Sequence, residues 1–597
     1  MHTGEQPGLS AQHRLPGRIA VTLPLIIALL SLTPAQAAAT MTRDAARDTP
    51  SSRHETLYVF TPARSGESLE RIASYLIPHP DVSLQQTAWA LYLKNPTAFA
   101  ENNINSIKPL PTLQIPSLQE IWKISHAQAQ RLIAGHNRAW ARTIHDHTPT
   151  ERQETDDTIV EETATGPEHQ PFTINTTVEI ESDYRSGYTL GHEDDETLTV
   201  SSYIYTEMRY EPSDRFTYFL ELNPYYSAEG IVGNEDGSND GGVELGSAWV
   251  YIDNLAGDDV GIQAGRQYFG DSRQWWWDAN LNALRLHSWG QPIHFHLGIG
   301  THPTLVSTTG GRRDPEQRDI VWLLGELNWD WANDQSIEFF WLSRLDRSDT
   351  PRQDDIVATK DADEEDVVLT WLGLRAMGQR TYATHGNLRY WLDLGMVYGN
   401  ESRLEFEDTD RANSIVTSRL DHKIDGWGLD IGASWDTRFP TRPRLTIAYA
   451  MGSGDADTGD NTDRNYRQSG LHNNNAELYG DTTFRYYGDV LDPELSNLSI
   501  ATLAIGFPLW KNNSINIVYH HYQQIHASAF LRNTQLSVDP NGDHLDIGQE
   551  LGLIVGLTGQ PPLNVTLRAA QFRAGKAFSA AAGQTASRLA FELSYGF

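Results

Sequence analysis

From residue 171 to the end of the chain, apolar and polar residues alternate with a period of two, as in a β-strand with two different faces. The final segment shows this most clearly. One of its faces carries Leu589, Phe591, Leu593, Tyr595 and Phe597, and the other carries Arg588, Glu592, Ser594 and Gly596. The first face suits lipid, the second suits water, and the length fits one tilted bilayer crossing. The pattern therefore predicts a transmembrane β-barrel that ends with this strand.

Such segments recur about 18 times, and an even number is typical of bacterial outer-membrane barrels. The first covers residues 172–181. Those between it and the last begin near Leu198, Phe216, Val243, Val260, Leu281, Ile293, Ile320, Ile337, Val367, Leu388, Ile424, Leu445, Leu498, Ile515, Leu551 and Leu563. The predicted fold class is an all-β transmembrane barrel of antiparallel strands over residues 171–597.

The connections between these segments are alternately short and long. The short ones are residues 211–215, 254–258, 290–291, 333–335, 378–386, 438–442, 511–514 and 558–562. The long ones include residues 182–196, 269–280, 301–318, 347–366, 400–421 and 452–497. Outer-membrane barrels place short turns in the periplasm and long loops outside, so both chain ends are expected in the periplasm.

A soluble β-sandwich or propeller is the competing architecture. Residues 388–398 argue against it, because an apolar stripe runs opposite charged and small residues. The stripe consists of Leu388, Tyr390, Leu392, Leu394, Met396 and Tyr398.

The start of the chain predicts export. Basic residues precede an apolar run at residues 19–32, and Ala35 and Ala37 provide the small residues of a cleavage site. Residues 1–37 are therefore predicted to be a secretory signal peptide. A membrane anchor is the alternative, but the run is short and Pro24 interrupts it.

Residues 55–116 combine strand and helix patterns in the order βααβ. They resemble the LysM module, in the variant at the start of FimV-type proteins, through the motifs Arg64–Ala73, Leu91–Phe99, Asn102–Asn105 and Leu113–Pro116. LysM-like modules bind glycans that contain N-acetylglucosamine, so the resemblance implies contact with peptidoglycan. The groove would include Gly66, Glu67, Asn95 and Pro96, although such residues are also common in turns and caps.

Two segments join this module to the barrel. Residues 122–140 predict one further helix, which completes a periplasmic domain at 55–145. Residues 146–170 are acidic, rich in threonine and without periodicity, as expected of a flexible linker.

The net charge of −32 excludes a general nucleic-acid binder, since no basic excess is available to displace counterions from phosphates. Much of the negative charge lies in predicted loops, including residues 192–196 and 361–366. Salt screens such exposed charges beyond about 8 to 10 Å. Arginines in a confined lumen are screened less, so an acidic protein can still have an anion-selective path.

Alternation places several arginines on inward faces: Arg209, Arg285, Arg389, Arg444 and Arg568. Strict alternation puts Arg266 with Ile262 and Ala264 on the outward face, unless a bulge intervenes. Inward arginines either select anions or pair with inward carboxylates, as the spacing of Arg389 and Asp393 suggests. Alternation leaves both interpretations open.

Residues 171–597 resemble the alginate-export family of outer-membrane barrels. The resemblance rests on the motifs Gly265–Gln267, Trp275–Asp278, Asn280–Arg285, Tyr466–Leu471, Asn473–Asn475 and Arg485–Leu498. Family members are 18-stranded barrels whose constricted, arginine-rich lumen lets a polyuronate leave the cell. The final short connection, at residues 558–562, departs from the family because it is too short to plug a pore.

The resemblance implies that Arg266, Arg285, Arg467, Arg485 and Arg573 contact uronate carboxylates. The inward Arg209 and Arg389 join them on the expected substrate path. Three tryptophans would either stack on sugar rings near the outer mouth or belong to an aromatic girdle: Trp275, Trp276 and Trp277.

These patterns predict an outer-membrane conduit for an anionic exopolysaccharide, alginate or a similar polyuronate. Its expected partners are this polymer, outer-membrane lipid, peptidoglycan and a periplasmic secretion scaffold that the module supplements or replaces. A porin for small anionic solutes and a structural tether to peptidoglycan are the alternatives. No enzyme, metal or other cofactor is expected, because the chain has no cysteine and its histidines lie outside interpretable catalytic motifs.

Overall fold

A computed structural model describes residues 59–60, 69–74, 84–99, parts of 103–136, and 172–596 apart from gaps in the connections between strands. The larger gaps are residues 192–195, 232–236, 256–259, 289–291, 304–307 and 309–318. The predicted signal peptide and linker lie outside the described residues, as do Gly66, Glu67 and Phe597.

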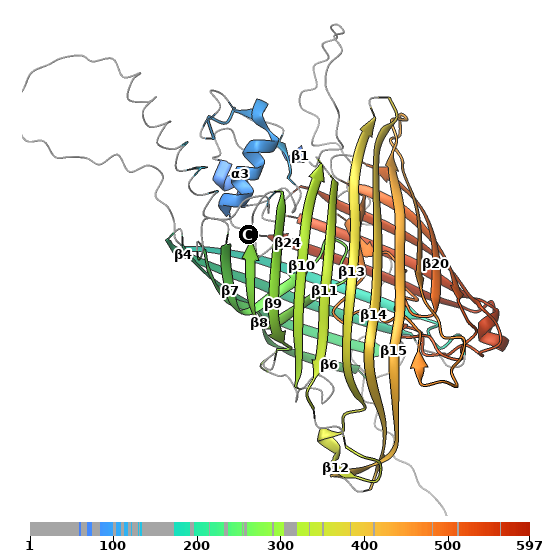
Figure 1. Ribbon diagram of the computed structural model, residues 1–597. Coiled ribbons are helices and arrows are strands. Elements are labelled where there is room, and N and C mark those ends of the chain that lie inside the picture. Colours follow the sequence, from blue (N-terminus) through green and yellow to red (C-terminus); the bar gives the residue numbers. More distant parts are fainter. Residues whose placement is uncertain are drawn as a thin grey trace, which may run out of the picture. The chain divides into compact units, whose positions relative to one another are not determined.

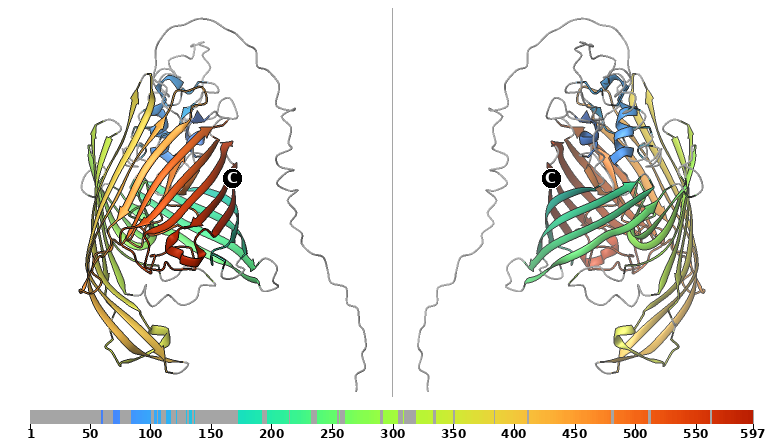
Figure 2. Two further views of the ribbon diagram at one scale, coloured as in Figure 1. Left: turned by 90° about the vertical axis from the view of Figure 1, so that its right-hand side faces the viewer. Right: turned by 90° about the vertical axis from the view of Figure 1, so that its left-hand side faces the viewer.

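Eighteen antiparallel strands close into one barrel, which confirms the predicted fold (Figures 1 and 2). They are β3 (Phe172–Ser186), β4 (Thr197–Ser213), β5 (Phe216–Ile231), β6 (Gly237–Ile252), β7 (Val260–Gly270), β8 (Asp278–Ser288), β9 (Ile293–Thr301), β10 (Ile320–Ala332), β11 (Gln335–Asp346), β13 (Glu365–Tyr382), β14 (Gly386–Asp408), β15 (Asn413–Asp436), β16 (Arg444–Gly452), β20 (Leu498–Pro508), β21 (Ser514–Gln524), β22 (Asp546–Gln560), β23 (Leu563–Ala574) and β24 (Thr585–Gly596). Every predicted segment start lies within one of these strands.

Shorter elements accompany the wall. Two short strands pair with β15, namely β12 (Ile356–Ala358) and β17 (Thr462–Asp463). A separate hairpin consists of β18 (Asn475–Tyr479) and β19 (Thr482–Arg485). Two 3-10 helices, η3 (Thr359–Asp361) and η4 (Lys576–Ala581), lie in connections.

The last strand closes the barrel against the first. β24 pairs with β3, with Leu593 opposite Ile180 and Arg588 opposite Arg185. Closure leaves no open edge between the ends of the wall, so the strands satisfy one another's backbone groups as lipid requires.

Side chains alternate between an apolar outer face and a buried inner face. On β14, Met396 and Tyr398 are 58% and 49% exposed, whereas Asp393 and Val397 are 0% and 1% exposed. The predicted lipid-facing stripe is therefore present. Its inner counterpart carries the charged residues of the lumen.

One predicted loop is wrong. Residues 400–421 were expected to form a long connection, but β14 and β15 remain paired through most of this range and only residues 409–412 join them. Leu404 and Val416 are buried there, and β12 adds a further strand to β15, so the segment has cross-strand partners of its own. This hairpin projects beyond its neighbours at the bottom of Figure 1.

The N-terminal module follows the predicted order, with β1 (Val59–Phe60), α2 (Leu69–Ser74), α3 (Leu84–Lys94) and β2 (Leu113–Gln114). The short 3-10 helix η1 (Pro96–Ala98) follows α3. The module has a buried core of its own, to which Ala129 and Ile133 of the predicted further helix contribute. Among the described residues, no helix has the length and apolarity to span a membrane.

Candidate functional site in the barrel lumen

Two connections at the long-loop end pack against the inner wall. Residues 271–277 join β7 to β8, and residues 453–497 join β16 to β20. Their apolar side chains share one buried cluster with inward residues of the strands, among them Trp275, Trp277, Tyr466, Tyr487, Leu495, Phe340, Trp371, Val397, Ile500 and Tyr522. A barrel of this strand number encloses a wide lumen unless something fills it. These two loops fill part of it.

The three consecutive tryptophans lie deep in this cluster. Trp275, Trp276 and Trp277 are 1%, 1% and 0% exposed. Trp276 stacks on Phe340 with ring centroids 5.0 Å apart, and Trp275 Nε1 donates to Tyr487 Oη over 2.8 Å. Neither predicted role fits this placement, because the rings are covered by protein and lie neither in an outer girdle nor at an open mouth.

A glycine in the wall makes room for one of these rings. A Cβ on Gly373 of β13 would lie 2.1 Å from the ring of Trp276. Any larger residue there must displace the tryptophan or the strand. The close approach explains why the loop can lie flat against the wall.

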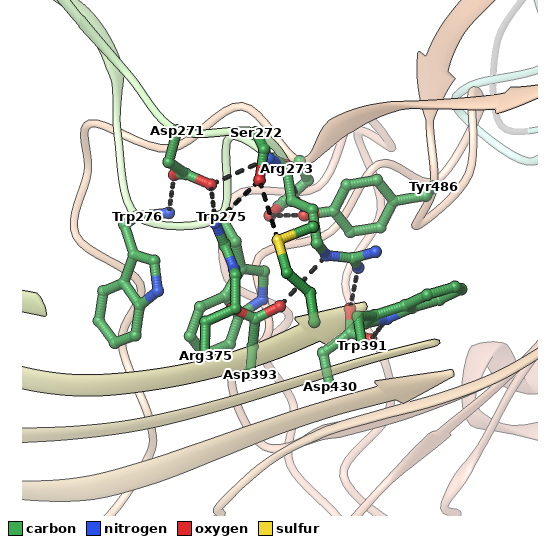
Figure 3. A network of polar contacts seen from close by, with 12 residues as sticks. Asp271, Ser272, Arg273, Trp275, Trp276, Arg375, Trp391, Asp393, Asp430 and Tyr486 are labelled. Carbon is green, nitrogen blue, oxygen red and sulfur yellow. Dashed lines mark hydrogen bonds and ion pairs between the residues drawn. The ribbon is translucent and has the colours of Figure 1, made fainter. Parts of the chain in front are cut away.

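A network of ion pairs fixes the shorter loop to three strands (Figure 3). Arg375 of β13 contacts Asp271 of the loop over 2.7 Å and Glu338 of β11 over 3.3 Å. It also contacts Asp393 of β14 over 2.5 Å. The Arg375 side chain is completely buried. Such a group persists in the interior only with partners on several sides.

Arg273 extends the network to β15. Its guanidinium contacts Asp393 over 3.2 Å and Asp430 over 2.9 Å. It lies between the rings of Trp391 and Tyr486, 4.5 Å from each centroid, which adds cation–π attraction. The loop is therefore held to the strands by two of its side chains, Asp271 and Arg273.

The protonation of the loop residues follows from these contacts. Burial alone would raise the pKa of Asp271, but Arg375 and the backbone N–H groups of Trp276, Trp277 and Arg273 hold it below its ordinary value. Burial opposes the charge of Arg273, but Asp430 and Asp393 raise its pKa above the ordinary value. Both groups stay charged, and the network contains two arginines against four carboxylates. It offers no excess cation to an anionic polymer.

The longer loop has its own anchors. Arg467 binds Glu401 of β14 in a bidentate pair at 2.5 and 2.8 Å, and also contacts Asp463 over 2.7 Å. Glu550 of β22 accepts the backbone N–H groups of Asp489, Val490 and Leu491. Arg467 is thus part of an anchor.

The inward arginines predicted from alternation make local contacts in the wall. Arg285 contacts His296 over 3.1 Å and lies 4.6 Å from the ring centroid of Phe269. Arg209 pairs with Glu211 over 3.4 Å. Arg389 contacts Asp436 over 3.6 Å, whereas its expected partner Asp393 is held by Arg273 and Arg375.

Two predicted path residues lie elsewhere. Arg573 is exposed on the face of β23 opposite Arg568, because the two residues are five positions apart on a strand whose side chains alternate between its faces. Arg266 donates to the backbone oxygen of Leu245 over 2.6 Å, just beyond the point where the β6–β7 ladder stops. Arg266 therefore bridges two separating strands, and both residues leave the list of substrate-path candidates.

A second group of arginines is accessible. Arg485 and Arg185 have side chains 32% and 38% exposed, and Arg568 and Arg588 are 21% and 14% exposed. Each has a carboxylate partner; these are Asp492, Asp183, Glu592 and again Asp183. We call these four arginines the accessible arginine cluster.

The members of this cluster influence one another. Burial, Arg588, Arg185 and Arg568 together lower the pKa of Arg485, although Asp489 opposes them. Neighbouring positive charges are thus felt at this position despite its pairing.

The sequence predictions missed several of these residues. Arg375 could have been found, since it alternates with Leu372 and Leu374 on the lipid side. Asp271 and Arg273 could not, because a loop has no periodicity that shows where its side chains point. Arg185 lies at the end of β3, in a range predicted to be a loop.

Comparison with known proteins connects this architecture to a family. The model of the family described as alginate export matches residues 168–592, which include the whole barrel from β3 to most of β24. The chain belongs to the alginate export family. An outer-membrane location follows from that membership together with the closed barrel.

Two curated relatives carry the same name. "Alginate production protein AlgE" of Pseudomonas aeruginosa is 25% identical over 296 residues, which cover 49% of this chain and 59% of that protein. The protein of the same name from Azotobacter vinelandii is 21% identical over 293 residues, 47% of this chain and 58% of the relative. The chain thus spans under two thirds of each relative's length.

Two solved structures resemble the chain at lower similarity. OpdK of P. aeruginosa has a TM-score of 0.44 and 10% identity, covering 71% of this chain and 98% of that one. OpdQ of the same organism has a TM-score of 0.41 and 10% identity, with the same coverage. In this alginate export family member, the family-like motifs from Trp275, Tyr466 and Arg485 onward all contribute to the two loops that pack against the inner wall.

Proposed function

We propose that the barrel is a passive conduit that exports an anionic polysaccharide, alginate or a similar polyuronate, across the outer membrane. Family membership supports the class of cargo. The observation that carries the proposal is the accessible arginine cluster, since its guanidinium groups are both partly solvated and crowded enough to affect one another.

Transport then proceeds by exchange of the carboxylate partners of these arginines. A uronate carboxylate can replace Asp183 at Arg588 with a similar bidentate bond, or replace Glu592 at Arg568, which holds Glu592 by one contact. Because these pairs are partly exposed, each exchange costs little. A polymer can therefore advance by successive exchanges, without any catalytic residue.

Charge reversal tests this path. Arg568→Glu is expected to lower anion selectivity in planar bilayers and to reduce secreted uronate about 10-fold, as the local field changes sign. Arg573→Glu is the matched control, because that arginine is on the same strand but on the outward face. Cation selectivity of the unaltered protein would contradict an anionic cargo. Permeation of small anions without polymer secretion would instead identify a small-solute porin.

We further propose that the N-terminal module binds peptidoglycan and tethers the barrel. The module has a core of its own, and Pro96 is exposed at the start of η1. Asn95 supports the fold, since its amide bonds to the backbone of Leu91 and Gln114. Pro96 is therefore the better candidate for glycan contact.

Deletion tests the tether. A chain lacking residues 55–145 should still secrete polymer but should no longer co-sediment with purified peptidoglycan sacculi. Retained co-sedimentation would contradict the tether. Lost secretion with intact folding of the barrel would show that the module delivers cargo instead.

A further inference from the structure

A row of three tyrosines lines the inner wall on β4 and β5. Tyr203 and Tyr205 have ring centroids 5.8 Å apart and planes inclined by 16°. Tyr203 and Tyr225 are directly paired across the two strands, with centroids 6.2 Å apart and planes inclined by 23°. Nearly parallel rings at this separation are displaced sideways by about 5 Å, since contacting planes lie only ~3.5 Å apart. Much of each ring face is thus not covered by its neighbour.

The row faces the lumen. Tyr203 and Tyr205 alternate with Ile204, which is an exposed residue of the lipid face. The three tyrosines are half-buried, unlike the completely buried tryptophans of the loop. A second tyrosine pair on the same strands, Tyr210 and Tyr218, lies on the outer face, where both are exposed.

Carboxylates border the row on both sides. Tyr205 Oη donates to Glu179 of β3 over 3.3 Å, and Tyr225 Oη donates to Asp240 of β6 over 2.8 Å. These acceptors hold the phenol groups in place. They also retain lone pairs for other donors at the edge of the rings.

The row continues sideways into the accessible arginine cluster. Glu179 is opposite Tyr203 in the β3–β4 ladder, and Glu181 is opposite Glu592 in the β24–β3 ladder. Glu592 in turn pairs with Arg568 over 3.2 Å. Cationic, acidic and aromatic groups therefore follow one another around one band of the wall.

We propose that Tyr203, Tyr205 and Tyr225 form a sugar-binding platform for the pyranose rings of the exported polymer. The apolar C–H face of a pyranose matches a partly covered aromatic face, and its hydroxyls can donate to Glu179 and Asp240. The carboxylate of a further sugar along the same polymer would then lie toward Arg568, since β23 is three strands away from β4 in the barrel. This inference rests on the proposed function and adds a site that recognises the sugar ring and not its charge.

The experiment measures binding to the full-length protein. Two probes of six sugars are used, an oligomannuronate and the neutral maltohexaose. Residence times of the probes are measured from single-channel block in planar bilayers. Equilibrium binding to detergent-solubilised protein measures the affinity for the same probes without requiring conductance. Heat-modified electrophoretic migration confirms that each variant is a folded barrel.

Loss of one ring should weaken the contact about five-fold. Tyr203→Ala and Tyr225→Ala should shorten the residence of oligomannuronate to that extent and leave ion selectivity unchanged. Tyr203→Phe keeps the ring and should retain most of the binding. Tyr210→Ala and Tyr218→Ala are matched controls on the outer face and should bind like the unaltered protein.

The outcomes separate the platform from the conduit. If the unaltered protein binds oligomannuronate but the inward variants bind it equally well, the platform is refuted and the conduit stands. Binding of maltohexaose as tightly as oligomannuronate, with both lost on Tyr203→Ala, supports the platform and contradicts the anionic cargo. If neither probe binds the unaltered protein, both ideas fall.

Discussion

The lumen has two halves that use charge differently. Along β11 to β15, arginine and carboxylate side chains are buried beneath the loop at residues 271–277, and Arg375 has no exposed surface. Along β23, β24 and β3 to β6, the ionic and aromatic side chains are partly solvated, and Arg185 is 38% exposed. In the first half, arginines and carboxylates hold the loop against the strands. In the second half, the same residue types form a solvated surface that a polymer can contact.

Solvation explains the difference. Removing one partner of a buried pair leaves an uncompensated charge, whereas a solvated pair can exchange partners at little cost. Counting inward arginines therefore says little about selectivity. What matters is which of them water, and hence a polymer, can reach.

The largest effect on stability is expected when Arg375 is removed from the buried ion-pair network. Arg375→Ala removes the ion-pair partner of Asp271 and Glu338 and leaves Asp393 paired with Arg273 alone. We expect a loss of about 3 to 5 kcal/mol in the free energy of unfolding. Urea unfolding in lipid vesicles measures it, with Arg573→Ala as the exposed control. An unchanged midpoint would mean that the network does not stabilise the loop.

Crowding the wall beneath the loop should have the next largest effect. Gly373→Ala places a methyl group where the Trp276 ring lies, at a cost of about 1 to 3 kcal/mol. The loop should detach, which would raise conductance and red-shift tryptophan fluorescence. Gly552→Ala is the control, since only one backbone oxygen lies within 4 Å of its Cβ position, at 3.9 Å. Equal behaviour of the two variants would contradict the tight fit.

Acid should loosen the same loop. Because the folded pKa of Asp271 is depressed, its stabilisation is fully present above the unfolded value near 3.9 and is lost as the pH falls through the folded value. Conductance should therefore rise below about pH 4. Asp271→Asn cannot titrate and should show a smaller acid response. An identical response would assign the effect to another carboxylate.

The smallest effect on stability is expected in the accessible half. Arg185→Gln removes a pair whose members are 38% and 20% exposed, so the free energy of unfolding should change by less than about 1 kcal/mol. Anion selectivity should nevertheless decrease, as reversal potentials in a salt gradient would show. A large loss of stability would contradict the difference between the half with buried ion pairs and the half with solvated ones.

Sequence patterns predict the wall well because lipid on one side and interior on the other impose a strict alternation. Every predicted segment start lies in a strand, and β24 closes against β3 as expected. The lumen is harder to predict. Trp275 to Trp277 read as surface aromatics, because nothing in a loop shows that it turns inward. Partners are also set by tertiary contacts, so Asp393 binds Arg273 and Arg375 and not its strand neighbour Arg389.

The seam between β24 and β3 also constrains how the barrel forms. Arg588 bonds to Asp183 across 405 residues of chain, so this contact has one of the longest loops to close. Contacts of such high sequence separation form slowly, and until they form two strand edges stay open to unwanted pairing. We therefore expect the Arg588–Asp183 pair to form in the last step of folding, when the two end strands meet and the barrel closes.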